Sequence, residues 1–204
     1  MDVTFFAAWI QEIIRVLSIN RDLLTRLDAA IGDADHGTNL DRGFTSVRQA
    51  LSDTPPDTPG QLLTLVGNTL IRRVGGASGP LYGSLFRQLG KSLGDAPEVS
   101  LDDLAAAFTT ALESVTRLGK AAEGDKTMVD ALAPAARTLS SAAREGLKPG
   151  EALDRAAAAA AEGAKATIPM QARKGRASYL GPRSVGHEDP GAASAALILS
   201  ALRP

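Results

Sequence analysis

Apolar residues recur every three or four positions along most of this chain, which is the spacing that places them on one face of an α-helix. The first such stretch runs from Val3 to about Ala30, as one long helix or as two helices that meet near Asn20. The later stretches are separated by turns that contain glycine or proline. They predict helices from Thr38 to Leu51, from Gln61 to Val74, from Ser78 onward, from Ser100 to Leu118, from Asp125 to about Glu145, from Lys148 to about Thr167, and from Asp189 to the end of the chain.

Several of these predicted helices have recognisable ends. Ser100 and Asp103 form a near capping box, with aspartate in place of glutamate or glutamine. Gly119 is a natural C-terminal stop for the same helix. We expect Asp125 to cap the next helix, and the pair Asp189-Pro190 places an N-cap before a proline in the first turn.

The pattern argues against a β-sheet. Strand-like alternation is absent, and β-branched residues are scarce beside alanine and leucine. The 204 residues are enough for one domain with a sizeable core. We therefore expect an all-α, single-domain bundle over residues 1–204. About eight helices would run alternately up and down, so that every second loop lies at the same end.

One segment departs from helical periodicity. It runs from Gln171 to Glu188, and we call it the basic segment because it carries four cationic side chains. Loops of this length are uncommon in compact domains, where they are often functional lids or disordered. The cationic residues are Arg173, Lys174, Arg176 and Arg183.

Composition narrows the classes of function. The net charge of -1 gives no reason to expect nucleic acid or an anionic membrane as a partner. There are no cysteines, which removes disulfides, thiolate chemistry and cysteine-ligated zinc, and fits a reducing cytoplasm. The N-terminal stretch, with an acid at position 2, is not a signal peptide, and the alanine run at 156–161 is too short to span a bilayer. We expect a cytoplasmic protein that acts through local clusters of charge.

Acidic residues gather in the stretch IGDADHGTNLDRGF, residues 31–44. If Asp28 ends the first helical stretch, Gly32 allows Asp33 and Asp35 to fold back beside it. Two carboxylates about 4 Å apart repel by about 4 kcal/mol at an effective dielectric constant of ~20, so the cluster needs solvent, protons or a cation. Oxygen ligands alone suit Mg²⁺ or Ca²⁺, although the spacing is not that of an EF-hand. The alternative is a solvated acidic turn that caps two helices.

Glycine occurs near four of the helix starts, at 37–39, 74–80, 123–127 and 188–191. Exposed N–H groups at a helix start favour phosphate, although glycine in helix turns is also routine. In an up-and-down bundle these loops share one end, where acids for a divalent cation, glycines for phosphates and arginines for developing charge would meet. That combination is what phosphoryl transfer needs. Neither a Walker motif nor a Rossmann fingerprint is present, so a plain helical scaffold remains an alternative.

Four motifs follow one another along the chain: IGDADHGTNLDRGF, GGASGPLYGSLF, GDKTMVDAL and MQARKGRASYLGPRSVGHEDPGA. In this order they resemble the L subunit, the ADP-binding subunit, of dihydroxyacetone kinase. The similarity runs nearly end to end and is weakest in the connectors at 52–60 and 92–100. It implies an eight-helix antiparallel α-barrel with a nucleotide site at one end. Residues 121–123, Ala-Ala-Glu, depart from the Glu-Pro that relatives often have in this turn.

The resemblance implies roles for individual residues. Asp28, Asp33 and Asp35 match the family's magnesium ligands, which normally hold a pair of Mg²⁺ ions. Arg176, as a phosphate or ribose contact, and His36 would act in catalysis. The residues that would contact ADP or ATP are His36, Gly37, Thr38, Asn39, Ala77, Ser78, Gly119, Met128, Arg176, Asp189, Pro190 and Gly191.

The resemblance also implies partners. In the bacterial form a separate K subunit holds dihydroxyacetone covalently, and an M subunit of the phosphotransferase system recharges a fixed ADP from phosphoenolpyruvate. In the fused form the nucleotide exchanges freely with ATP. Because this chain has no room for a K-like domain, it resembles the stand-alone subunit. Two alternatives stay open: an ATP-dependent kinase component for another short ketose such as erythrulose, and a nucleotide-dependent regulator that binds a transcription factor.

Overall fold

The structure is a computed structural model that describes residues 1–203. Within that range the chain forms nine α-helices, one 3₁₀-helix and no strand, which confirms the all-α prediction. The elements are α1 (Val3–Ile19), α2 (Arg21–Ile31), α3 (His36–Asp53), α4 (Pro59–Arg73), α5 (Ser78–Leu93), α6 (Leu101–Gly119), α7 (Val129–Arg144), α8 (Pro149–Ala166), η1 (Arg176–Ser184) and α9 (Pro190–Ser200).

The prediction of about eight helices was too low for two reasons. The first stretch is broken into two helices, and the basic segment contains η1. The first stretch is two helices that meet at Asn20 and are bent by 61° from one another. The Asn20 backbone N–H and side-chain amide both donate to the carbonyl of Val16, which ends α1. The basic segment is more regular than its sequence indicates, because η1 occupies its middle.

Of the four predicted helix ends, two are confirmed and one is wrong; α6 does end at Gly119, but its left-handed C-cap residue is Lys120, with φ of +47°. Ser100 and Asp103 form a full capping box, and the Asp189 carboxylate accepts from the Ala192 N–H at 2.7 Å at the start of α9. Asp125 does not cap α7, which begins only at Val129. Its carboxylate accepts from the Ala122 N–H at 2.9 Å and closes a turn in the loop before α7.

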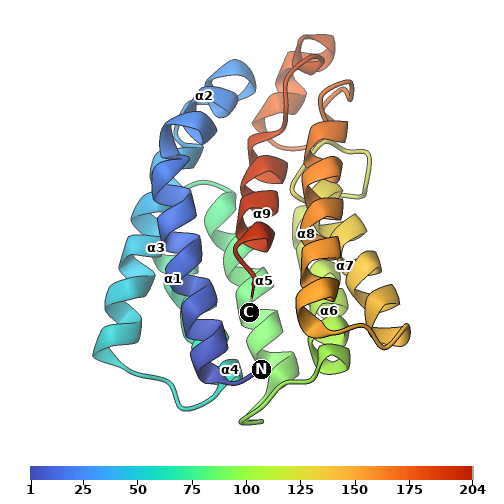
Figure 1. Cartoon of the computed structure of the whole chain (residues 1–204). Coiled ribbons are helices and arrows are strands. Elements are labelled where there is room, and N and C mark those ends of the chain that lie inside the picture. The colour runs from blue at the N-terminus through green and yellow to red at the C-terminus, as the bar shows by residue number, and fades with distance from the viewer. Residues whose placement is uncertain (204) are drawn as a thin grey trace.

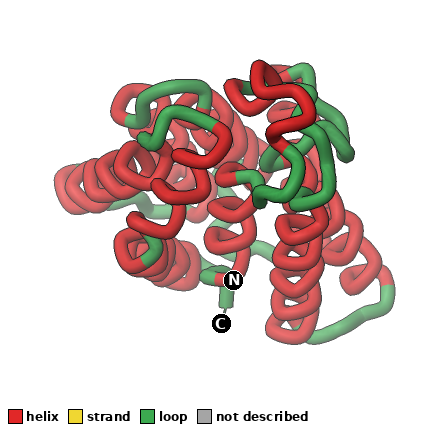
Figure 2. Tube along the Cα trace, turned by 90° about the horizontal axis from the view of Figure 1, so that it is seen from above, coloured by secondary structure: helices red, strands yellow, loops and turns green. Residues whose placement is uncertain are grey.

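The helices run alternately up and down, except that α1 and α2 follow one another in the same general direction (Figure 1). The loops after α2, α4, α6 and α8 therefore lie together at the upper end of Figure 1. Figure 2 looks down on this end and shows the loops passing between the helix ends. The alternation expected from the sequence thus brings four loops from distant parts of the chain to one place.

An apolar core fills the space between the helices. Trp9 lies at its centre, with ring centroids 5.5 Å from Phe86 and 6.4 Å from Phe108. Its indole N–H donates to the carbonyl of Ile198 at 3.0 Å, which ties α1 to α9. Where α4 crosses α5, a Cβ at Gly67 would lie 2.5 Å from the Arg87 backbone nitrogen, so only glycine permits this approach.

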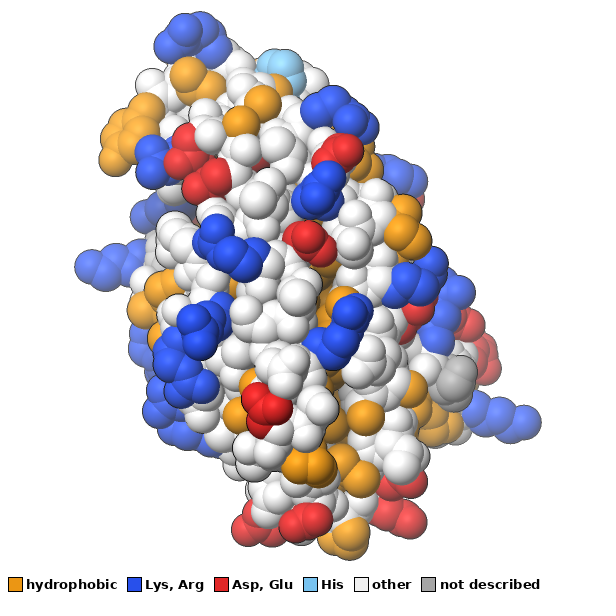
Figure 3. Space-filling view, turned by 90° about the vertical axis from the view of Figure 1, so that its left-hand side faces the viewer, with side chains coloured by type: hydrophobic (Ala, Val, Ile, Leu, Met, Phe, Trp, Pro, Cys, Tyr) orange, Lys and Arg blue, Asp and Glu red, His pale blue; other side chains and the backbone are white. Residues whose placement is uncertain are grey.

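Among the described residues no single helix is long and apolar enough to cross a membrane. The α1–α2 pair together reaches that length and composition, but the pair is bent, and six large apolar side chains of α1 are buried in the core. On the face drawn in Figure 3, basic and acidic side chains are interspersed, and hydrophobic side chains form small separate groups.

Candidate functional site

A cavity of about 270 Å³ opens at the end of the bundle where the four loops meet. Its wall is built from the end of α2, the starts of α5 and α9, the loop before α7 and the middle of the basic segment. Most of the residues singled out in the sequence line this one cavity. They are Asp28, Asp33, Asp35, His36, Ala77, Ser78, Gly119, Met128, Arg176, Asp189, Pro190 and Gly191.

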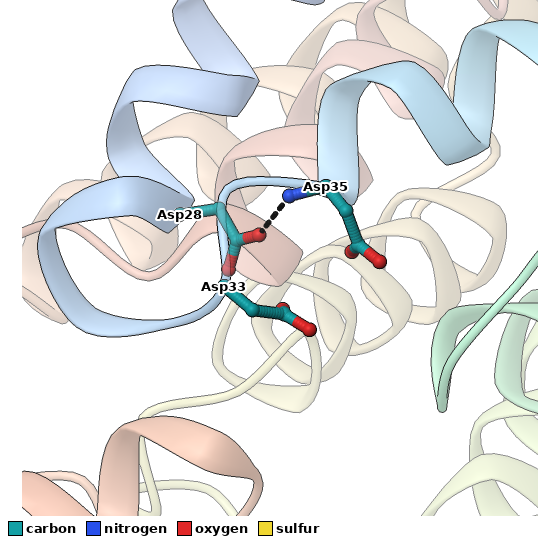
Figure 4. A group of neighbouring side chains, drawn as sticks. All are labelled: Asp28, Asp33 and Asp35. Atoms are coloured by element: carbon teal, nitrogen blue, oxygen red, sulfur yellow. Dashed lines mark hydrogen bonds between the residues drawn. The ribbon is translucent and has the colours of Figure 1, made fainter.

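Three aspartates stand at one side of the cavity (Figure 4). Asp28, Asp33 and Asp35 each offer a carboxylate oxygen, and these oxygens all lie within 4.8 Å of one another. Asp28 is buried, and its Oδ2 accepts from the backbone N–H of Asp35 at 2.8 Å and of His36 at 3.1 Å. These two bonds fold the loop back onto the end of α2, as expected from the sequence.

The geometry of this cluster fits a hard divalent cation. A Cβ at Gly32 would overlap Oδ1 of Asp28, so the glycine leaves that oxygen accessible beside the loop. Three carboxylates within reach of one another, with no nitrogen or sulfur donor among them, form the ligand set that Mg²⁺ or Ca²⁺ prefers. The Nε of Arg176 lies 3.0 Å from Oδ2 of Asp33, and this ion pair offsets part of the negative charge.

The start of α5 forms another part of the cavity wall. Ala77 occupies the N-cap position of this helix and provides no side-chain cap for its first N–H groups. Gly76, with φ of +64°, makes the turn that leads into the helix. Uncapped N–H groups at a helix start are a favourable environment for an anion. The start of α5 therefore offers an anion position in the same cavity as the three aspartates.

The opposite part of the wall is apolar. Leu81, Val115, Met128 and Val129 line it together with the backbone at Gly119. Met128 is buried and stands at the start of α7. A nucleoside base would find a hydrophobic surface here, while its phosphates would reach the polar side of the cavity.

His36 is buried with both ring nitrogens in hydrogen bonds. Its Nδ1 lies 3.1 Å from the Ser78 hydroxyl and its Nε2 lies 2.8 Å from the Ser194 hydroxyl. Burial lowers the pKa of His36, against the opposing charges of Asp28 and Asp35. The ring is therefore neutral near pH 7 and joins the starts of α3, α5 and α9.

Asp189 is another buried ionisable group at this end. Burial raises the pKa of the Asp189 carboxyl to about 7, although its bond from the Ala192 N–H favours the charged form. Tyr82, which sequence reasoning missed, is buried and lines the cavity. Its hydroxyl lies 2.6 Å from that of Ser194, and burial raises its pKa. Ser194 was also missed, because a small residue inside an apolar helix carries no sequence signal.

Three of the predicted nucleotide contacts do not line the cavity. Because α3 begins at His36, the residues that follow turn away along the helix. Gly37 packs against α2, where a Cβ would lie 2.6 Å from the Thr25 hydroxyl. Thr38 is exposed, and Asn39 is buried and accepts from Arg42 at 2.7 Å. A nucleotide role for Gly37, Thr38 and Asn39 stays a prediction.

Lys126 is a buried residue of this site that sequence reasoning did not single out. The residue is 1% exposed. Its ammonium group donates only to backbone carbonyls, two of which precede the basic segment and two of which lie near its end. Nothing in the motif GDKTM distinguishes this lysine from a surface lysine, because its partners lie far along the chain.

Comparison with known proteins identifies the family of this chain. Residues 30–204 match the DAK2 domain family. The ADP-binding subunit DhaL of the PEP-dependent dihydroxyacetone kinase of Escherichia coli (strain K12) is 41% identical over 194 residues, which are 95% of this chain and 92% of that subunit. The DhaL subunit of the PEP-dependent dihydroxyacetone kinase 2 of Listeria innocua is 39% identical over 204 residues, covering 99% of this chain and 94% of its own.

A solved structure matches the fold as well. The crystal structure of the dihydroxyacetone kinase from C. freundii in complex with AMP-PNP and Mg²⁺ superposes with a TM-score of 0.75 and 26% identity. The match covers 99% of this chain and 34% of that kinase, so the chain spans about a third of the larger protein. The chain belongs to the DAK2 domain family and, within it, to the DhaL group of ADP-binding subunits of PEP-dependent dihydroxyacetone kinases.

Proposed function

We propose that this chain is the ADP-binding subunit of a dihydroxyacetone kinase and holds the nucleotide from which a phosphoryl group is transferred. The observation that carries the proposal is the meeting of three groups in one cavity. They are the carboxylates of the acidic loop, the uncapped start of α5 and the guanidinium of Arg176.

Asp28, Asp33 and Asp35 would hold Mg²⁺, as a pair of ions, against the diphosphate of ADP or the triphosphate of ATP. When bound, Mg²⁺ neutralises phosphate charge and so favours transfer of the terminal phosphoryl group. Asp28 is fixed for this task by its two backbone hydrogen bonds, whereas Asp33 and Asp35 are exposed on the cavity side. The metal assignment rests on this donor set.

The other side chains orient the nucleotide and exclude water. Ser78 and the backbone at the start of α5 would position phosphate oxygens, and Arg176 would stabilise charge that develops during transfer. His36 would hold the Ser78 hydroxyl in place, and the catalytic role that the resemblance implies for His36 stays a prediction. Met128 and Gly119 would contact the nucleoside.

The acceptor would come from a partner. A K-type subunit that carries covalently bound dihydroxyacetone would present the hydroxyl to the open end of the cavity. An M subunit of the phosphotransferase system would recharge the fixed ADP from phosphoenolpyruvate. The similarity to DhaL subunits over nearly their whole length supports this arrangement. Specificity for the ketose would then lie on the partner.

The test begins with a freshly purified sample that is denatured and assayed for released nucleotide. One ADP per chain supports the proposal, and none after preparation with Mg²⁺ and added ADP contradicts it. Turnover is then measured with a K-type subunit, in one reaction with phosphoenolpyruvate and the phosphotransferase proteins and in another with free ATP. Turnover only with free ATP would contradict the fixed-cofactor form of the proposal. Turnover only with erythrulose would show that the ketose is not dihydroxyacetone. Tight ADP binding without turnover would favour a regulator.

A further inference from the structure

Lys126 occupies a closed cage of backbone oxygens. Its Nζ lies 2.9 Å from the carbonyl oxygen of Thr167, 3.0 Å from that of Met170, 2.7 Å from that of Ser184 and 2.5 Å from that of His187. Charged hydrogen bonds of this kind are among the stronger ones. The Thr167 carbonyl also accepts from the Met170 N–H at 3.1 Å, whereas the carbonyls of Met170, Ser184 and His187 would each lose their bond to the ammonium group without Lys126. The cage therefore binds the ammonium group of Lys126, a cation that belongs to the chain itself.

The four carbonyls come from two separate stems. Thr167 and Met170 lie where the chain leaves α8 and enters the basic segment, whereas Ser184 and His187 lie where it returns to α9. One ammonium group thus joins the entry and the exit of the same loop. The Gly186 N–H, which donates to the Ile168 carbonyl at 2.8 Å, is the direct backbone link between the two stems.

The part of the basic segment that lies between the two stems forms part of the cavity wall. Residues 174–177 line the cavity, and Arg176 reaches Asp33 from there. Arg176 is largely exposed, with 69% of its side chain accessible, so its own ion pair contributes little to holding the loop. Its position depends on the anchoring of the stems.

Lys126 also has a strained backbone for a residue with a side chain. Its φ is +61°, in the left-handed region that non-glycine residues rarely adopt. This conformation accompanies a side chain that points into the molecule from a surface loop, next to the Arg173 N–H bond to the Asp125 carbonyl at 3.1 Å. Such strain persists only where surrounding contacts hold it.

We propose that Lys126 is a positioning residue for phosphoryl transfer: it clamps the two stems of the basic segment together and so holds Arg176 beside the acidic cluster. This inference rests on the proposed function for its catalytic consequence, but the clamp itself can be tested on the free chain. Lys126 touches neither the nucleotide phosphates nor the acceptor in this role. It acts through the loop that it anchors.

The test compares Lys126→Met with Lys120→Met, a substitution of an exposed lysine in the same loop. Limited trypsin digestion of the free chain reports on the basic segment, which contains four cleavable residues. We expect cleavage there to rise about tenfold or more in Lys126→Met and to stay at the wild-type rate in Lys120→Met. Fluorescence of the single tryptophan, buried in the core, checks that the bundle remains folded.

A second readout separates positioning from simple support of the fold. In Lys126→Met we expect bound ADP to dissociate about tenfold faster and kcat with the K-type partner to fall, while KM for the loaded partner stays near the wild-type value. Because the chain has no cysteine, Lys126→Cys can be alkylated in denaturant with bromoethylamine and refolded, which restores an ammonium group at nearly the lysine length. This chemical rescue should return both protection and ADP retention.

Unchanged protease protection in a folded Lys126→Met chain would overturn the clamp. Faster cleavage with unchanged ADP retention and unchanged kcat would overturn the positioning role. If Lys126→Met does not fold, the alkylated Lys126→Cys chain decides instead: it should match the wild type, whereas the same chain alkylated with iodoacetamide should be cleaved rapidly. If wild-type chain binds no ADP, the proposed function fails, and the digestion result still stands by itself.

Discussion

The guanidinium Nε of Arg176 lies 3.0 Å from Oδ2 of Asp33, so the basic segment and the acidic loop are in direct contact at the cavity. Both side chains belong to the same wall, although one precedes α3 and the other precedes α9. An exposed ion pair of this kind contributes little to stability. Its importance is that it places a cation at the position where phosphates would bind next to the acidic cluster.

Replacing Arg176 with alanine should therefore change catalysis and leave stability almost unaltered. We expect phosphoryl transfer with a saturating partner to slow by on the order of 10²-fold, because a preorganised charge would be missing from the transition state. The thermal midpoint should stay near the wild-type value, as for other exposed pairs. Arg183→Ala, an exposed arginine of the same segment, is the matched control. An unchanged rate in Arg176→Ala would remove the basic segment from the mechanism.

Asp35→Asn tests the acidic cluster. The substitution keeps the size of the side chain but removes one of three carboxylates whose oxygens lie within 4.8 Å of one another. We expect purified protein to lose Mg²⁺ and ADP together, with an unchanged helical circular dichroism spectrum, because Asp35 makes no side-chain cap for α3. Metal and nucleotide content per chain are the measurements.

The control for this substitution is Asp22→Asn, an exposed aspartate on α2 that pairs only with its neighbour Arg21. It should retain ADP and Mg²⁺ at the wild-type level. If Asp35→Asn still carries one equivalent of ADP and Mg²⁺, the cluster is a solvated turn after all.

Local signals in the sequence were sufficient for much of the fold. Ser100 and Asp103 lie three positions apart, so their capping box depends on no other element. Asp125 was assigned wrongly because a second acid, Asp130 in the first turn of α7, competes for the N–H groups of the preceding loop. It is Asp130 whose carboxylate accepts from the N–H groups of Gly124 and Thr127, and the helix therefore starts later than the sequence indicates.

The acidic cluster could also be predicted, because Asp28, Asp33 and Asp35 are joined by a single tight turn. The contacts of Lys126 and His36 could not. The ammonium group of Lys126 meets carbonyls 41 to 61 positions away, and the His36 ring meets Ser194 at a separation of 158. Such contacts follow from helix packing, which local periodicity does not determine.

The buried His36 network predicts a measurable coupling. Replacing His36 with leucine leaves the Ser78 hydroxyl without its ring partner and removes one partner of Ser194, so we expect the free energy of unfolding to fall by about 1–3 kcal/mol. A double-mutant cycle with Ser194→Ala should give an interaction energy above about 0.5 kcal/mol, because the two residues are in direct contact. Additive losses in urea unfolding would mean that the bond contributes nothing.

Asp189 predicts a dependence of stability on pH. Burial raises the pKa of its carboxyl in the folded chain from 3.8 to about 7, so the folded state binds more protons than the unfolded state between these values. Its contribution to stability is therefore fully present below pH 3.8 and is lost as the pH rises towards 7. Asp189→Asn keeps an acceptor for the Ala192 N–H but does not ionise. Relative to the wild type, the variant should gain stability steadily from about pH 4 to pH 7 and remain level above it. Urea unfolding at a series of pH values measures this difference. A difference independent of pH would show that Asp189 is already ionised in the folded chain near pH 4, held there by the ammonium group of Lys126 and the N–H groups at the start of α9.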